Sequence, residues 1–167
     1  LTGAKLHVTH LSTKGALEKI RQAKQEGLAV TCDVTPHHIA LTDEAIKDYD
    51  TNFKMNPPLR TEEDRKAMIE GIKDGTVDAI ATDHAPHQIE EKDQEFEHAP
   101  FGVIGLETAF AISYSELCLK EKIALETLVD RLAVRPAKML GLQKFNEIIE
   151  GSAANLTLVN LDKKWTV

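Results

Sequence analysis

Short apolar runs alternate with helical patterns along the first half of the chain. Three runs have the length and the β-branched content of strands: Lys5–Thr9, Leu28–Thr35 and Val77–Thr82. Between them, apolar residues recur at helical spacing after possible N-cap residues, Ser12 or Thr13 and later Thr61. Strands that alternate with helices predict a parallel α/β arrangement, because parallel strands need crossover connections.

The second half of the chain has a different pattern. The segment Asp83–Gly105 shows no clear period and is longer than most connections, which is typical of a functional or a disordered loop. Helical spacing returns from Leu106, and Pro136 can start another helix. The tail Ala153–Leu161 has strand character again. A short helix is also expected after Thr42.

Composition narrows the class of protein. The 167 residues fit one domain, and 42% apolar residues are enough to form a core. A net charge of −7 without a basic cluster argues against nucleic acid or an anionic membrane as the main partner. No apolar run reaches the ~18 residues that a membrane span needs. Cys32 and Cys118 lie far apart without metal-ligand spacing, which fits a reduced, cytoplasmic protein.

Titratable side chains gather directly after the three predicted strands. These residues are His10 after the first strand, His37 and His38 after the second, and Asp83, His84 and His87 after the third. Active sites of parallel α/β folds form at the carboxyl ends of the strands. The pattern therefore predicts a site at this edge of the sheet.

The individual residues differ in how well they suit such a site. His7 and His10 lie three residues apart and point to opposite faces of a strand, so His10 is the candidate and His7 is expected to be packed or solvated. His37 and His38 are neighbours on a predicted loop, cannot both point inward, and favour a structural role. The carboxylate of Asp83 is suited to bind a metal or to transfer a proton. The alternative is that it only stabilises a turn.

Imidazole and carboxylate together are the ligand types that zinc prefers. The chain has no H-E-x-x-H motif, no G-x-S-x-G nucleophile elbow and no glycine-rich phosphate loop. Metal-assisted hydrolysis is therefore favoured by elimination.

Five motifs carry a resemblance to a known family: HVTHLST from His7, TPHH from Thr35, MNPPLR from Met55, ATDHAPH from Ala81 and FGVIGLET from Phe101. In this order they resemble the C-terminal part of the class I dihydroorotases, which are metal-dependent cyclic amidohydrolases. The resemblance implies an α/β fold in which residues 1–150 form the C-terminal part of a (β/α)₈ TIM barrel, strands six to eight with their helices. Residues 151–167 would begin the return into a small β domain.

The resemblance also implies roles for individual residues. His10 would be a zinc ligand, and Asp83 would be both a metal ligand and the catalytic acid and base. Asn56 and His87 would bind the substrate, and Phe101 and Gly102 would lie in the loop that contacts the pyrimidine ring. The implied reaction is the reversible hydrolysis of L-dihydroorotate to N-carbamoyl-L-aspartate in pyrimidine synthesis, with one or two zinc ions.

The family's other metal ligands, after strands one, four and five, do not occur in these residues. The expectation is therefore a fragment that is inactive alone, completed by an N-terminal part of the same protein. A homodimer and aspartate transcarbamoylase are possible partners. Two alternatives stay open: another cyclic amidohydrolase, such as a dihydropyrimidinase or hydantoinase, and a non-catalytic scaffold for aspartate transcarbamoylase.

Overall fold

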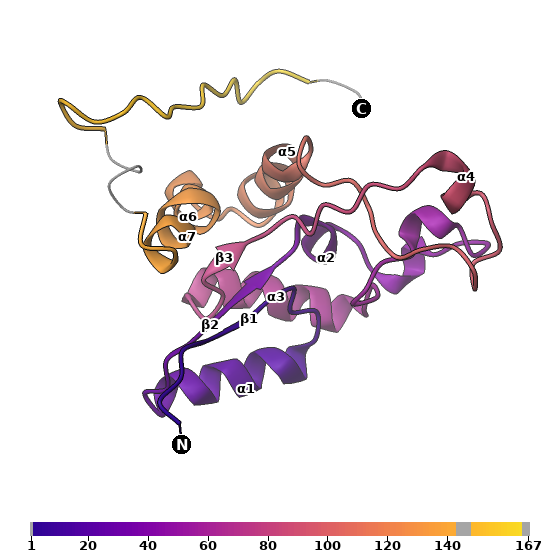
Figure 1. The fold of residues 1–167 in the computed structure, drawn as a ribbon, viewed down its shortest axis with the longest axis horizontal. Helices are drawn as coiled ribbons and strands as arrows, with labels where there is room; N and C mark the ends of the chain where they lie inside the picture. Colours follow the sequence, from indigo (N-terminus) through magenta and orange to yellow (C-terminus); the bar gives the residue numbers. More distant parts are fainter. Residues whose placement is uncertain (1, 143–147, 165–167) are drawn as a thin grey trace.

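A computed structural model describes residues 2–142 and 148–164 of the chain. Three strands form one parallel sheet in the order β1-β2-β3, with β1 at Leu6–Val8, β2 at Val30–Val34 and β3 at Ala79–Ile80. Leu6 pairs with Val30, and Asp33 pairs with Ala79. Figure 1 shows β2 between its two neighbours, with α1 (Lys14–Gln25) alongside them. The predicted parallel α/β arrangement is confirmed.

The two long helices begin at cap residues that the sequence predicts. The hydroxyl of Thr13 accepts a hydrogen bond from the Ala16 amide at 3.3 Å at the start of α1. The hydroxyl of Thr61 accepts one from the Asp64 amide at 3.3 Å at the start of α3, Glu62–Asp74. Each bond satisfies an amide that has no partner inside its helix. Gly75, with φ 85°, ends α3 in the left-handed conformation that favours glycine.

The helices bury one apolar face each against the sheet and against one another. The core consists of buried apolar side chains from these elements and from the later helices: Leu11, Leu17, Ile20, Cys32, Val34, Ile39, Met68, Ile69, Ile72, Val77, Ile80, Leu117, Ile123 and Leu128. β2 contributes Cys32 and Val34 to this core and β3 contributes Ile80, while Val8 of β1 packs against it.

The remaining helical elements are short. They are α2 (Pro36–Ala40), η1 (Asp43–Ala45), η2 (Thr51–Phe53), α4 (Ile89–Lys92), α5 (Ala109–Ser113), η3 (Tyr114–Lys120), α6 (Leu125–Val129), η4 (Asp130–Val134) and α7 (Arg135–Met139). The helix expected after Thr42 is the single 3₁₀ turn η1. A short helix, α4, lies within the long irregular segment that follows β3.

The last helices form continuous helical runs. α7 begins one residue before Pro136, as expected, but it continues η4 without any non-helical residue between them. Proline has no amide hydrogen to donate to the preceding turn. The π-helical element η4, whose turns are wider than those of an α-helix, ends at Val134, two residues before Pro136. None of the helices among residues 2–142 and 148–164 is long and apolar enough to cross a membrane.

Helix α2 corrects one expectation. His37 and His38 lie in this helix rather than on a loop, and both side chains are buried, at 7% and 3% exposure. Pro36 ends β2 and occupies the first turn of the helix, where its missing amide hydrogen costs nothing. The prediction that the two side chains could not both point inward is wrong, because α2 is enclosed on more than one side.

The tail corrects a second expectation. Ala153–Leu161 has strand character in sequence, but this segment forms no strand within the described residues 148–164. Its apolar side chains are exposed, with Leu156 at 68% and Leu158 at 99%. Figure 1 shows this segment running apart from the sheet. A strand needs a neighbouring strand for its hydrogen bonds, and this segment has none among the described residues.

The burial of α2 generates a prediction about pH. Burial, with smaller contributions from His38 and His10, lowers the pKa of His37 from 6.5 to about 3. Above pH 6.5 the ring is neutral in both the folded and the unfolded chain. Below pH 6.5 only the unfolded chain takes up the proton, so the free energy of unfolding falls by about 1.4 kcal/mol per pH unit from this group.

We therefore expect His37→Gln to make the free energy of unfolding less dependent on pH between pH 6 and pH 4. Urea unfolding at several pH values measures this slope. His98→Gln is the control, because the side chain of His98 is 67% exposed. Equal slopes for the wild type and His37→Gln would contradict the burial argument.

Candidate functional site

The carboxyl edge of the sheet brings His10 and Asp83 to opposite flanks of β2. The Leu11 amide donates to the Asp33 carbonyl at 2.9 Å, and the Ala81 amide donates to the Val34 carbonyl at 3.0 Å. His10 therefore leaves β1, and Asp83 leaves β3, beside the last residues of β2. Strands lie about 4.8 Å apart, so the outer two are separated by about 10 Å.

Both residues have a backbone conformation that is uncommon for side chains with a Cβ. The φ angle is 41° at His10 and 49° at Asp83. Left-handed residues of this kind cost on the order of 1–3 kcal/mol and gather at active sites and ligand clamps. Five non-glycine residues among those described have a positive φ, and two of them are the predicted metal ligands.

The donors at this edge suit zinc but do not complete a site. His10 is half-buried and Asp83 is exposed, so neither residue is enclosed in the core. An imidazole and a carboxylate are suitable zinc donors, whereas a catalytic zinc usually has three protein ligands. Among the described residues no group of three or more such side chains is placed to hold a metal. The edge fits part of a metal centre.

His38 connects this edge to the loop that carries Asn56. Its Nδ1 lies 2.7 Å from the Thr35 hydroxyl, and its Nε2 lies 3.0 Å from the Pro57 carbonyl. A carbonyl can only accept, so Nε2 carries the proton and Nδ1 accepts from Thr35. The exposed Asn56 directly precedes this anchored Pro57. His38 therefore has the structural role that the sequence favoured.

His87, Phe101 and Gly102 come together in the segment that follows β3. His87 Nε2 donates to the Phe101 carbonyl at 2.8 Å, and His87 Nδ1 lies 3.4 Å from Glu91. Gly102 has φ 139°, and a Cβ built on it would lie 2.7 Å from the Ala85 carbonyl oxygen. Only glycine therefore fits at this close approach. The sequence predicted the three residues but not the contacts among them.

His84 is occupied by the backbone of the same segment. Its Nδ1 accepts a hydrogen bond from the Gly105 amide at 3.0 Å. This contact fixes the return of the chain after the loop, since Gly105 also passes within 3.0 Å of the Thr82 carbonyl. His84 thus has a structural role in the described residues.

Lys54 is a structural residue beside the candidate site that sequence reasoning missed. It is only 8% exposed, and its ammonium group donates to the carbonyls of Phe96, Glu97 and Ala99 at 2.6, 3.0 and 2.6 Å. The same group lies 4.8 Å from the centre of the Phe101 ring. Three donors matched by three acceptors satisfy a buried cation. The only signal was a lysine between the apolar Phe53 and Met55.

Lys54 also holds the predicted substrate loop through its main chain, because its carbonyl accepts from the Gly102 amide at 3.0 Å. Asn56 lies two residues after Lys54 in the chain. The substrate-binding residues predicted from three separate motifs thus converge on the surroundings of Lys54.

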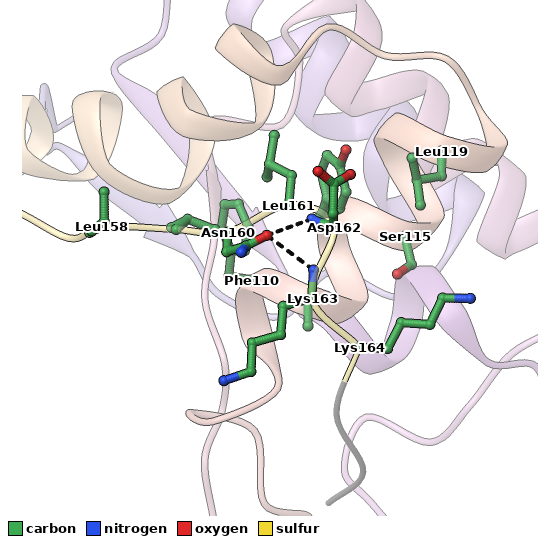
Figure 2. Close-up of a pocket in the computed structure, with 12 residues that line it drawn as sticks. Phe110, Ser115, Leu119, Leu158, Asn160, Leu161, Asp162, Lys163 and Lys164 are labelled. Carbon is green, nitrogen blue, oxygen red and sulfur yellow. Dashed lines mark hydrogen bonds between the residues drawn. The ribbon is translucent and has the colours of Figure 1, made fainter.

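A large groove elsewhere does not involve these residues. It has a volume of about 900 Å³ and lies between the tail and the helical run α5–η3. Figure 2 shows Asn160 at this groove, where its side-chain oxygen accepts from the amides of Asp162 and Lys163 at 3.0 and 3.1 Å. None of the predicted site residues lines it. The groove is therefore separate from the candidate site.

Comparisons with known proteins show which family the chain resembles. The model of the amidohydrolase family matches residues 2–167. The dihydroorotase of Carboxydothermus hydrogenoformans is 55% identical over 96% of this chain and 37% of that protein. The dihydroorotase of Caldanaerobacter subterraneus is 51% identical over 99% of this chain and 38% of that protein. The chain thus spans less than two-fifths of these curated relatives, and the resemblance seen in the sequence is confirmed.

Solved structures agree on the fold. The dihydropyrimidinase of Brevibacillus agri superposes with a TM-score of 0.84 at 28% identity, covering 91% of this chain and 35% of that one. The L-hydantoinase of Arthrobacter aurescens gives 0.85 at 29% identity over 91% and 35% of the two chains. These neighbours support an α/β fold of the TIM-barrel type. From its sequence and its fold, the chain belongs to the amidohydrolase family.

Proposed function

We propose that this chain is part of a dihydroorotase, which interconverts L-dihydroorotate and N-carbamoyl-L-aspartate in pyrimidine synthesis. The observation that carries the proposal is the position of His10 and Asp83 at the same carboxyl edge of the sheet, in a chain 48–55% identical to several proteins named dihydroorotase. In the proposed whole protein, β1 to β3 are strands six to eight of a (β/α)₈ barrel. Residues 1–150 belong to that barrel, and residues 151–167 begin the small β domain.

In this proposal His10 and Asp83 hold zinc together with ligands from outside the described residues. Bound zinc would lower the pKa of water to about 7 and polarise the carbonyl that is attacked. The donor set supports this assignment, since both side chains are zinc ligand types. The sheet supports it too, because both donors project from the edge at which barrel enzymes have their sites.

Asp83 would also move the proton. In the ring-opening direction, water adds to the ring amide carbonyl, and the carboxylate of Asp83 accepts the proton that the water loses. It then delivers this proton to the amide nitrogen as the carbon–nitrogen bond breaks. General acid–base catalysis of this kind contributes roughly 10²- to 10⁴-fold. The exposure of Asp83 and its position past the end of β3 support this role.

Asn56, His87, Phe101 and Gly102 would orient the substrate. Since His87 Nε2 is committed to the Phe101 carbonyl, Nδ1 is the ring atom available to a ligand. Nδ1 can donate only when the ring carries both protons, and its neighbour Glu91 shows that an acidic group fits there. The carboxylate of dihydroorotate would take that position and compete with Glu91.

The second candidate is a dihydropyrimidinase or hydantoinase. The solved neighbours with these names favour it, with TM-scores of 0.84 and 0.85. Their identity to this chain is 28% and 29%, against 55% for a protein named dihydroorotase. Choice of substrate separates the two, because dihydrouracil lacks the carboxylate that His87 would bind.

One test of the proposed function concerns Asp83. In the protein that contains this chain, Asp83→Asn keeps the shape of the side chain but cannot accept the proton. We expect the turnover number for dihydroorotate to fall at least 10²-fold while the substrate still binds. Steady-state kinetics and calorimetric titration with dihydroorotate measure the two quantities. Asp43→Asn, at an exposed position in η1, is the control, and near-normal turnover in Asp83→Asn would exclude the role.

Another test of the proposed function concerns His87. We expect His87→Ala to raise KM for dihydroorotate roughly tenfold to a hundredfold, the value of a hydrogen bond to a charged group. The wild type should hydrolyse dihydrouracil poorly, and His87→Ala should not weaken that reaction further. His98→Ala, at an exposed position, serves as the control. A wild type that prefers dihydrouracil would favour the second candidate instead.

A further inference from the structure

Asp33 is a buried carboxylate at the candidate site to which sequence reasoning gave no role. It lies on β2, one residue before the strand ends, and is 3% exposed. Both of its oxygens are used: Oδ1 accepts the His10 amide hydrogen at 2.7 Å, and Oδ2 lies 2.7 Å from His7 Nε2. A buried charge of this kind is tolerated because both oxygens have partners.

Asp33 holds the turn after β1 through two consecutive amides. Its side chain accepts from the amide of His10, and its own carbonyl accepts from the amide of Leu11 at 2.9 Å. Two amides held by one residue fix the peptide planes on both sides of the His10 Cα. They therefore set the direction in which the His10 side chain leaves the backbone. This matters here because His10 has φ 41°, away from the conformation that it would otherwise prefer.

His7 holds Asp33 in turn. A carboxylate can only accept, so His7 Nε2 donates to Asp33, and His7 Nδ1 shares a hydrogen bond with the Thr31 hydroxyl at 2.8 Å. A chain of hydrogen bonds thus runs from Thr31 through His7 and Asp33 to the amide of His10. Each bond to the charged carboxylate is stronger than a bond between neutral groups. His7, expected to be packed or solvated, has this definite contact.

We propose that Asp33 is a positioning residue of the metal edge, and that His7 orients it. Asp33 keeps His10 in its left-handed conformation and so presents the imidazole to the metal that the proposed function requires. The inference rests on that proposed function only for the identity of the ligand at His10. Asp33 does not contact the metal or the substrate in this proposal.

A merely structural carboxylate would behave differently, and the chain offers a matched example. Asp78, next to β3, is also buried, at 9% exposure. Its Oδ2 accepts from the Cys32 amide at 2.9 Å and from the Lys24 ammonium at 2.6 Å. The type of contact is the same, but Asp78 precedes β3 at the amino end of that strand, away from His10. Asp78→Asn therefore controls for the loss of a buried carboxylate.

The test compares Asp33→Ala, Asp33→Asn and Asp78→Asn in the protein that contains this chain. The readouts are zinc affinity, by competition with a chromophoric chelator, and the midpoint of thermal unfolding of the zinc-free protein. We expect Asp33→Ala to weaken zinc binding by about tenfold or more, the usual effect of losing an outer partner of a metal ligand. Asp33→Asn should fall between Asp33→Ala and the wild type, because its amide oxygen can still accept from His10. Asp78→Asn should lower the unfolding midpoint and leave zinc affinity unchanged.

The outcomes separate this proposal from the proposed function. Wild-type zinc affinity in both Asp33 variants would overturn the positioning role, as would equal losses of affinity in Asp33→Asn and Asp78→Asn. If Asp33→Ala does not fold, Asp33→Asn and His7→Ala decide, and the latter should also weaken zinc binding. If the wild type binds zinc but does not open dihydroorotate, the proposed function fails while the comparison of affinities still stands. A wild type that binds no zinc overturns both.

Discussion

The carboxyl edge of the sheet depends on one strand, β2, because both neighbouring strands end on its carbonyl groups. Leu11 bonds to Asp33 after β1, and Ala81 bonds to Val34 after β3. These two bonds decide where the chain leaves the sheet on each side, and hence where His10 and Asp83 begin. β2 is itself held by buried side chains such as Cys32 and Val34, both fully enclosed. The packing of the core therefore determines the geometry of the candidate site.

A second buried charge, that of Lys54, fixes the backbone around the predicted substrate-binding residues. Lys54 binds three carbonyls of the segment that leads to Phe101, and its own carbonyl binds the Gly102 amide. An irregular segment lacks the regular backbone hydrogen bonds of a helix or a sheet. Where such a segment is buried, side chains must therefore supply partners for its backbone groups. Lys54 and Asp33 have the same effect with opposite charge, since each is a buried ion that fixes the backbone beside a candidate site residue.

The sequence revealed those features that depend on local chemistry. The strands follow from short apolar runs, and the helix starts at Thr13 and Thr61 follow from a hydroxyl that can cap an amide. The positions of His10 and Asp83 follow from the rule that sites form at strand ends. The tail was wrongly predicted to form a strand, because a strand also needs a neighbouring strand, and a local sequence pattern does not show whether one is present. Asp33 and Lys54 were missed for a related reason: their partners lie 23 and more than 40 residues away, so a charge in an apolar run has no visible purpose.

The strain at the sheet edge connects stability with function. His10 and Asp83 both have left-handed φ angles, and neither is the glycine that would adopt them without cost. Each costs on the order of 1–3 kcal/mol, and such a cost persists only where the surroundings hold the backbone in place. At His10 these surroundings are the hydrogen bonds to Asp33. The buried Asp33 carboxylate accepts from the His10 amide, and the Asp33 carbonyl accepts from the Leu11 amide. Glycine would relax this edge, but it would supply neither the imidazole nor the carboxylate that the proposed function needs. The bonds that Asp33 makes are what allow a histidine to occupy a position whose backbone favours glycine.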